Sequence, residues 1–217
     1  MTTCSRWSEL AECLAFHADL AHNASAPTEF RLLNHGPPVR VGFTSTKEGK
    51  RKSMKSAQNQ LEKFKAQLKA PPFGQTPLCR HITEVVAQIQ SVADELRQNG
   101  QLACLVIASD GEATDGKLAK VMKALKDLPV WVVVRLCTND PVIIKYWNDI
   151  DHELELNMDV LDDFHNEGIE VKNLNPWLTY GEPLHRMREF GVHIKELDLL
   201  DEQPCMIAQV RQIAAVM

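Results

Sequence analysis

The chain has 217 residues, of which 44% are hydrophobic and 24% charged, and its formal net charge at pH 7 is -5. This length and composition suit one globular domain and exclude a disordered or fibrous chain. The acidic balance argues against general nucleic-acid binding, which needs a surplus of Lys and Arg. No apolar run reaches the roughly 18 residues of a membrane span, so we expect no membrane partner.

The cysteines are scattered along the chain and form no CxxC pair. Neither a zinc knuckle nor a thioredoxin-like motif is therefore expected. The N-terminus also lacks the basic and then apolar pattern of a signal peptide. We expect a reduced compartment and a cytoplasmic protein. The six cysteines are Cys4, Cys13, Cys79, Cys104, Cys137 and Cys205.

The first third of the chain predicts two helices and two short strands. Apolar residues recur with the helical period over residues 8–22. Residues 29–34 and 39–44 indicate two short strands that are joined by a tight, proline-containing connection. Residues 47–69 favour an amphipathic helix with a basic outer face, which we interpret as a solvated surface rather than an anion site.

The middle of the chain predicts a strand–helix–strand unit. Residues 82–96 have the most regular helical period. Residues 102–108 are a continuous apolar run that stops at Ser109, as expected of a central parallel strand covered on both faces. Residues 117–128 favour a helix, and residues 130–136 favour another buried strand. This order predicts an α/β fold with a doubly wound, mainly parallel sheet flanked by helices.

The last third of the chain is less regular. Residues 141–150 and 158–166 indicate short helices, residues 192–200 a last strand and residues 206–216 a closing helix. Residues 177–184 (WLTYGEPL) form either a recognition loop or a long loop that its aromatic side chains pin to the core. We favour the second interpretation.

The best candidate for a functional residue is Asp110, which directly follows the apolar run of residues 102–108. Ligands of open parallel sheets bind at the carboxyl ends of the strands. A carboxylate beside Gly111, which permits close approach, suits a hard divalent cation. Thr76, in the loop before the 82–96 helix, is expected to supply a second oxygen in the same crevice. An Asp-Gly pair after a strand alone also predicts an ordinary turn.

Two segments resemble, in their order and spacing, the metal-site loops of the von Willebrand factor A (vWA) family. Residues 74–78 (GQTPL) look like the loop that gives its threonine to the metal-ion-dependent adhesion site. Residues 105–112 (LVIASDGE) look like the strand and loop that give its aspartate. The resemblance covers residues 1–138. It implies a Rossmann-like sheet, Mg²⁺ or Mn²⁺ on Thr76 and Asp110, and an open coordination position that accepts a carboxylate from a protein partner.

The sequence departs from the family pattern at its beginning. The family site starts with Asp-x-Ser-x-Ser at the end of the first, central strand, and residues 1–7 resemble the run that follows this motif. We therefore expect the first central strand to be missing from this chain. Magnesium prefers near-octahedral oxygen coordination, so Thr76 and Asp110 alone predict weak or absent metal binding. Loss of the strand also predicts unpaired backbone groups beside the gap.

The resemblance thus predicts a single vWA-like domain, with a core over residues 1–138 and a C-terminal elaboration over residues 139–217. Its expected function is protein binding inside the cell through an incomplete metal site, without catalysis. One alternative is a hydrolase-like enzyme that uses Asp110, or Cys79 near His81, although GxSxG, GxGxxG and Walker motifs are absent from the sequence. A second alternative is a metal-free scaffold in which Asp110 caps the following helix.

Overall fold

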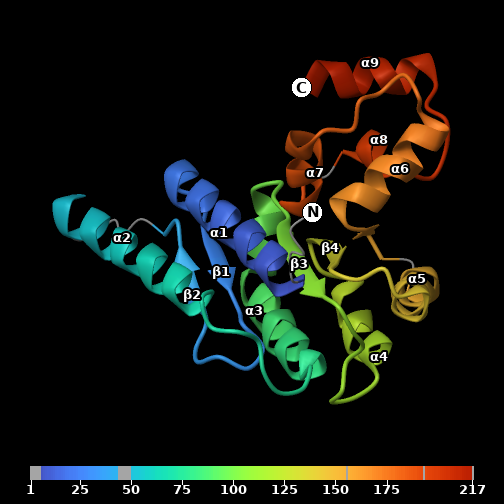
Figure 1. The fold of residues 1–217 in the computed structure, drawn as a ribbon. Helices are drawn as coiled ribbons and strands as arrows, with labels where there is room; N and C mark the ends of the chain where they lie inside the picture. The colour runs from blue at the N-terminus through green and yellow to red at the C-terminus, as the bar shows by residue number, and fades with distance from the viewer. Residues whose placement is uncertain (1–5, 44–49, 155, 193, 217) are drawn as a thin grey trace. The chain divides into compact units, whose positions relative to one another are not determined.

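The structure is a computed structural model that describes residues 6–43, 50–154, 156–192 and 194–216 (Figure 1). Contacts between Cα atoms divide the chain into two compact units, Met1–Pro77 and Leu78–Met217. We call them unit 1 and unit 2 and describe each by itself. Each unit contains its own β-sheet. The arrangement as a single domain stays a prediction.

Unit 1 contains two long helices and a short hairpin. α1 (Arg6–Ala24) and α2 (Lys50–Gln67) are the two helices that the apolar periods predict. β1 (Thr28–Phe30) pairs antiparallel with β2 (Val39–Val41), so both predicted strands exist but are shorter than expected. A two-stranded hairpin is marginally stable alone, and here it packs against helices.

The core of unit 1 comes from the apolar faces of its helices and hairpin. The ring of Phe64 stacks on that of Phe30 with centroids 4.4 Å apart. Lys65 Nζ contacts the two carboxylate oxygens of Asp19 at 2.7 and 2.8 Å and so joins α2 to α1. Lys63 and Lys69 are exposed, as the solvated-face interpretation expects. The buried members of the core are Ala18, Ala21, Val41, Leu61, Phe64 and Leu68.

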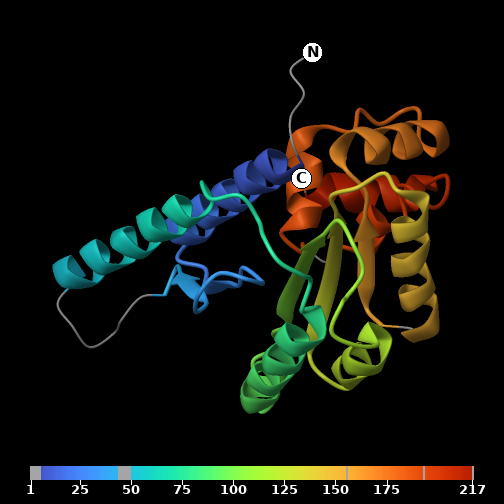
Figure 2. The same ribbon diagram turned by 60° about the horizontal axis from the view of Figure 1, so that its bottom comes forward.

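Unit 2 is built on a three-stranded parallel sheet. Its strands are β3 (Ala103–Ser109), β4 (Val130–Leu136) and β5 (Met158–Leu161), in that order. They run side by side in the same direction (Figure 2). The predicted α/β class with parallel strands is therefore confirmed.

The helices of unit 2 alternate with these strands. α3 begins a turn earlier than the sequence predicts, and Gly100 follows it with a φ of 62°, a conformation that glycine adopts without strain. No described helix of either unit is both long and apolar enough to cross a bilayer. The helices are α3 (Leu78–Gln98), α4 (Leu118–Met122), the 3₁₀ turn η1 (Lys123–Leu125), α5 (Pro141–Leu154), α6 (Phe164–Leu174), α7 (Glu182–Glu189), α8 (Lys195–Asp198) and α9 (Ile207–Val216).

Two predicted elements of the last third are wrong. Residues 158–166, predicted as a helix, contain β5 and then the start of α6. The buried acid Asp159 interrupts the apolar pattern of β5 and hides the strand. Residues 192–200, predicted as a strand, contain α8, whose Leu197 is buried in the core cluster of the C-terminal helices.

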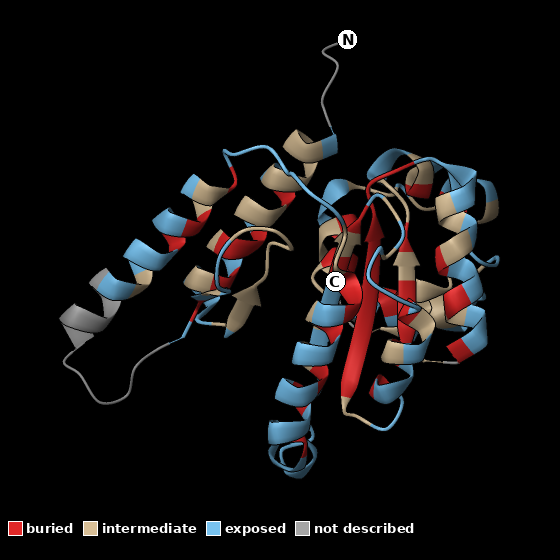
Figure 3. Cartoon of the chain, turned by 90° about the horizontal axis from the view of Figure 1, so that it is seen from below, coloured by how far each residue is buried: buried red, intermediate tan, exposed pale blue. Residues whose placement is uncertain are grey.

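The position of β3 in the sheet also differs from the prediction. β4 is buried at all seven of its residues and is the central strand, whereas burial along β3 is mixed (Figure 3). Within β3, Val106 keeps 43% of its surface exposed. An apolar run predicts a strand, but it cannot distinguish a central strand from an edge, because that depends on which other strands pair with it.

Candidate functional site

Aspartates follow all three parallel strands of unit 2. Asp110 comes directly after β3, Asp140 lies four residues after β4, and Asp162 and Asp163 follow β5. Because the strands are parallel, their carboxyl ends lie along the same edge of the sheet. The sequence predicts only the first of these acids, although Asn139-Asp140-Pro141 after a buried strand is a recognisable turn and cap signal.

The loop after β3 presents Asp110 on a constrained turn. The buried hydroxyl of Ser109 donates to the carbonyl of Gly111 at 3.0 Å and accepts its N–H at 3.2 Å. The carbonyl of Ser109 accepts the N–H of Cys137 at 3.0 Å, so the ends of β3 and β4 remain joined. Asp110 itself is exposed. The local sequence therefore fixes the backbone and leaves the Asp110 side chain at the surface.

The loop after β4 uses its aspartate to begin a helix. The buried Thr138 accepts the N–H of Asp140 with its hydroxyl at 3.2 Å. Asp140 Oδ1 in turn accepts the N–H of Val142 at 2.9 Å, which is the bond of a helix N-cap at the start of α5. Asp140 therefore has a structural role that occupies one of its oxygens.

Asp115 connects the loop after β3 to the first turn of α3. Its two carboxylate oxygens accept the N–H groups of Cys79 and Arg80, both at 2.9 Å. Desolvation acts to raise the pKa of the Asp115 carboxyl, but these two hydrogen bonds lower it below its ordinary value. The sequence gives no signal for this contact, because the cap and the helix are separated by 35 residues.

We expect Asp115→Ala to destabilise unit 2 by about 1 kcal/mol, the usual cost of losing a helix cap. The N–H groups of Cys79 and Arg80 would lose their acceptor. Urea unfolding of this variant and of Asp149→Ala, an exposed carboxylate on α5, measures the difference. Equal unfolding midpoints for the two variants would remove the capping role.

A shallow pocket of about 380 Å³ opens beside the loop after β3. Lys145 Nζ bonds both oxygens of Asp149 at 2.7 Å, which largely neutralises these two charges. Burial raises the pKa of the Tyr146 phenol, and the charge of Glu112 adds to this shift. The pocket thus offers mainly the Glu112 carboxylate and apolar surface. It is lined by Glu112, Pro141, Val142, Lys145, Tyr146 and Asp149.

The second predicted metal ligand, Thr76, lies in the segment before α3 and is partly exposed. Asn34 holds this segment within unit 1, because its Nδ2 donates to the carbonyls of Phe73 at 2.6 Å and Gln75 at 2.7 Å. Thr76 belongs to unit 1 and Asp110 to unit 2. The meeting of these two side chains in one crevice stays a prediction.

The donor chemistry at Asp110 fits a hard cation, but the number of ligands does not fill a coordination shell. Exposed carboxylate oxygens are the ligands that Mg²⁺ prefers. Within the described ranges, Asp110 belongs to no group of three or more carboxylate, imidazole or thiol side chains close enough to hold one ion. Any ion at Asp110 therefore depends on oxygens from water, hydroxyl groups or a partner.

The residues proposed for catalysis lack the properties of a nucleophile and its base. Burial raises the pKa of the Cys79 thiol, and the charge of Asp115 raises it further. A cysteine nucleophile needs the opposite shift. His81 Nε2 lies 3.2 Å from Nη2 of Arg80. These contacts give the hydrolase alternative no support.

The scaffold alternative also meets a difficulty in its proposed cap. The helix that follows Asp110 is α4, which begins at Leu118. Its N-cap residue is Lys117, and no side chain caps this helix among the described residues. Asp110 therefore does not cap the following helix.

A buried charged cluster surrounds Arg188 of α7. Arg188 is 2% exposed and donates to Asp159 of β5, to Glu167 of α6 and to Asp201 after α8. Burial raises the pKa of Glu167 to about 8. The charge of Arg188 lowers this pKa, but three carboxylates share that one guanidinium, so its effect is smaller than the effect of burial. The cluster joins α7 to β5, α6 and the segment after α8.

Part of the Arg188 cluster is also a possible cation site. Oxygens of Glu167, Glu170 and Asp201 lie close enough together to share one ion. Arg188 already forms ion pairs with Glu167 and Asp201. A cation would have to compete with this guanidinium, so the group is better explained as a structural ion-pair network.

Glu189 forms a second buried network next to Arg188. Its carboxylate accepts Arg135 Nε at 3.0 Å and Arg186 Nη1 at 2.8 Å, and His185 Nε2 lies 3.3 Å away. Tyr180 Oη lies 3.1 Å from the other nitrogen of His185. α7 therefore contacts β4 through the ion pair of Glu189 with Arg135. The two residues are 54 positions apart, so no local charge pattern of the sequence predicts this pair.

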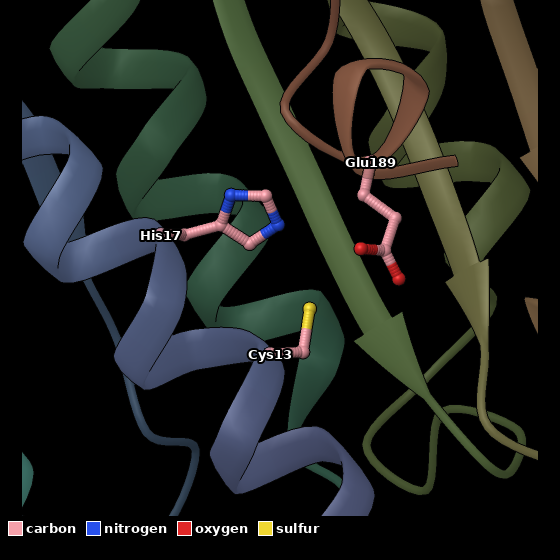
Figure 4. Close-up of side chains that lie close together, drawn as sticks. All are labelled: Cys13, His17 and Glu189. Carbon is pink, nitrogen blue, oxygen red and sulfur yellow. The ribbon is translucent and has the colours of Figure 1, made fainter. Parts of the chain in front are cut away.

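Among the described residues of unit 1, a buried histidine and a buried cysteine lie on α1. Cys13 and His17 are one helical turn apart on the same face of this helix (Figure 4). The ring of Phe16 meets that of His17 edge-on, with centroids 5.5 Å apart. Both residues lie on the buried face of α1, together with Ala18 and Ala21.

Of the predicted loop of residues 177–184, residues 182–184 begin α7, and the remainder has few features of a recognition loop. Leu178 and Tyr180 pack against the core cluster of the C-terminal helices. Trp177 is half exposed, and its indole N–H donates to Asn175 Oδ1 at 3.2 Å. Most of the loop is thus held to unit 2, as the favoured interpretation expects.

Comparison with protein-family models, with curated proteins and with solved structures finds no match for this chain.

Proposed function

We propose that this chain is a protein-binding module of the vWA type, in which the Asp110 loop forms an incomplete site for Mg²⁺ or Mn²⁺. The observation that carries the proposal is the exposed Asp110 carboxylate at the carboxyl end of β3, on a turn that Ser109 constrains. The bound ion would accept a carboxylate from a partner protein. The remaining coordination positions would be filled by water.

The contact of Asp115 supports a contribution from Thr76. Asp115 holds Cys79, three residues after Thr76, to the loop that begins at Asp110. Thr76 lies two residues before the start of α3 along the chain. Thr76 is thus the second ligand in this proposal, and the low ligand number keeps the affinity weak.

The sheet of unit 2 supports a doubly wound, Rossmann-like arrangement. β3 and β4 are parallel strands connected by α4, as in such folds. β3 lies at the edge of the described sheet. The described cysteines are free thiols, which supports the proposed cytoplasmic location.

The test is calorimetric titration of the full chain with Mg²⁺. We expect weak, saturable binding that becomes at least about tenfold weaker in Asp110→Asn, because even residues that only support a metal ligand usually matter this much. Asp94→Asn, which changes an exposed carboxylate on α3, is the matched control. Equal binding by all three proteins would exclude Asp110 as a ligand.

A further inference from the structure

More carboxyl groups meet at Arg188 than its single charge can balance. Its guanidinium bonds Asp159 of β5 and Asp201 after α8, both at 3.2 Å, and also Glu167 of α6. A fourth carboxyl group, that of Asp198 in α8, forms a hydrogen bond with Asp159. If all four were ionised, four negative charges would share one guanidinium in a largely buried place.

Two contacts within this cluster join one carboxyl group to another. Glu167 forms a hydrogen bond with Asp201, and Asp198 forms one with Asp159. A carboxylate has no hydrogen to donate, so each contact exists only while one of its two members is protonated. The cluster therefore holds two protons, and their loss would leave two pairs of facing negative charges.

Both contacts join the end of the chain to the rest of unit 2. We call residues 195–216, which contain α8 and α9, the C-terminal segment (Figure 1). Asp198 and Asp201 belong to this segment, whereas Asp159 lies in β5 and Glu167 in α6. Repulsion within the two carboxyl pairs would therefore act between the segment and the elements it packs against.

Apolar and amide contacts also hold the C-terminal segment. Its buried apolar side chains share one core cluster with side chains of α6 and α7. Asn175, at the end of α6, accepts the N–H of Cys205 with Oδ1 and donates Nδ2 to the carbonyl of Leu200, both at 2.8 Å. Contacts of these kinds do not titrate near neutral pH. A pH-dependent change in docking therefore has to come from the carboxyl contacts.

We propose that the carboxyl–arginine cluster is a pH-sensitive switch, in which loss of two protons undocks the C-terminal segment while the sheet of unit 2 stays folded. The two protons pass to water, and no other atom is transferred. A segment at the end of a chain opens at a lower free-energy cost than a whole unit. The switch is separate from the Asp110 loop and needs no metal ion.

The pKa values of the two proton-holding groups place the transition near neutral pH. Burial raises the pKa of Glu167 to about 8, and burial together with the charge of Asp159 raises the pKa of Asp198 to about 7. Undocking admits water, which moves both pKa values back toward their ordinary range. Docking is therefore favoured at low pH and is weakened as the pH rises through about 7 to 8.

The neighbours of these two groups supply no second positive charge. The charged and titratable groups that face Glu167 or Asp198 are Arg188 of α7, Tyr180 before α7, Asp159 of β5, Asp162 before α6, Glu170 of α6, and Asp201 and Glu202 after α8. Arg188 is the only cation among them, so ionisation of the carboxyl pairs adds repulsion that these neighbours do not neutralise.

Amide hydrogen exchange, measured by NMR on the full chain from about pH 6 to about pH 8.5, tests the proposal. The probe is the N–H of Cys205, because its bond to Asn175 exists only while the segment is docked. The reference is the N–H of Val132 in β4, which donates to Asn157 at 3.0 Å. The protection factor corrects for the intrinsic effect of pH on exchange. For Cys205 it should fall at least about tenfold over this range, and Val132 should stay clearly more protected than Cys205 throughout.

A double variant provides the matched comparison. Glu167→Gln with Asp198→Asn keeps a donor for each partner carboxylate but has no proton to release. The protection factor of Cys205 should then stay nearly constant with pH. Asp94→Asn with Asp149→Asn changes two exposed acids and should behave as the wild type does.

Three results would overturn the proposal, and the first two need only the wild-type protein. The protection factor of Cys205 can stay constant from about pH 6 to about pH 8.5. Cys205 and Val132 can become equally protected at high pH, which would mean that the whole unit opens together. The double variant can show the same fall as the wild type, which would assign the pH dependence to other groups.

Discussion

Arg188→Met is expected to destabilise unit 2 by roughly 3–5 kcal/mol, the cost of removing one partner from a buried ion pair. Asp159, Glu167 and Asp201 would lose the guanidinium that they share. Methionine keeps the length of the aliphatic stem, so lost packing contributes little. The loss of charge pairing therefore dominates the effect.

Urea unfolding measures this loss in unit 2 alone when the NMR signals of β4 are used to monitor it. Arg97→Met is the matched control, because Arg97 pairs with Asp94 at the surface of α3 and both side chains are exposed. Exposed pairs contribute about 0–1 kcal/mol. If Arg188→Met lost no more stability than Arg97→Met, the buried cluster would not hold unit 2 together.

The second large effect is a loss of stability as pH rises from about 4.5 to about 8. The folded-state pKa of Glu167 is raised by burial from its ordinary 4.5 to about 8. A raised pKa means that, between the two pKa values, the folded protein keeps a proton on Glu167 that the unfolded chain releases. The contribution of this group to the free energy of unfolding is therefore fully present below pH 4.5 and is lost as the pH rises through about 8. Burial also raises the pKa of Asp198, to about 7, with the same sign.

Glu167→Gln removes the titrating group and should flatten this dependence. We expect the wild-type protein to lose roughly a few kcal/mol over the interval and the variant to lose clearly less. The unfolding midpoint in urea, measured at several pH values for both proteins, gives the comparison. Asp94→Asn, at an exposed site, should follow the wild-type curve. Stability that rises with pH over this interval in the wild type would contradict the assignment.

The elements with a strong local pattern are those that the sequence predicts well. The apolar period of α3 and the uninterrupted run of β4 both correspond to elements of the structure. β5 is missed because it has only four residues and contains a buried Asp159 whose partner, Arg188, lies 29 residues away. α8 is missed because a single helical turn is too short to show a period.

The candidate site could be predicted only in part for the same physical reason. Asp110 follows a long apolar strand, so its position at a strand end can be read from neighbouring residues. Asp115 acts on α3 across 35 residues, and Arg188 collects carboxylates from separate elements. Such contacts depend on the packing of the whole unit, and no local spacing encodes them.

β3 lies at the edge of the described sheet, and the exposed Asp110 directly follows it. The sequence predicts β3 as a covered central strand, and in the structure its outer backbone groups are not used by any described strand. Asp110 lies at the carboxyl end of this same strand.

Paramagnetic broadening by Mn²⁺ tests the proposed metal site most directly, because it locates the ion on the chain. In NMR spectra of the full chain, low concentrations of Mn²⁺ should broaden the amide signals of Ser109, Asp110 and Gly111 first. Excess Mg²⁺ should restore these signals, and Asp110→Asn should prevent the broadening. Broadening that begins elsewhere, for example at Glu167 and Glu170, or that persists in Asp110→Asn, would contradict the assignment of Asp110 as the metal ligand.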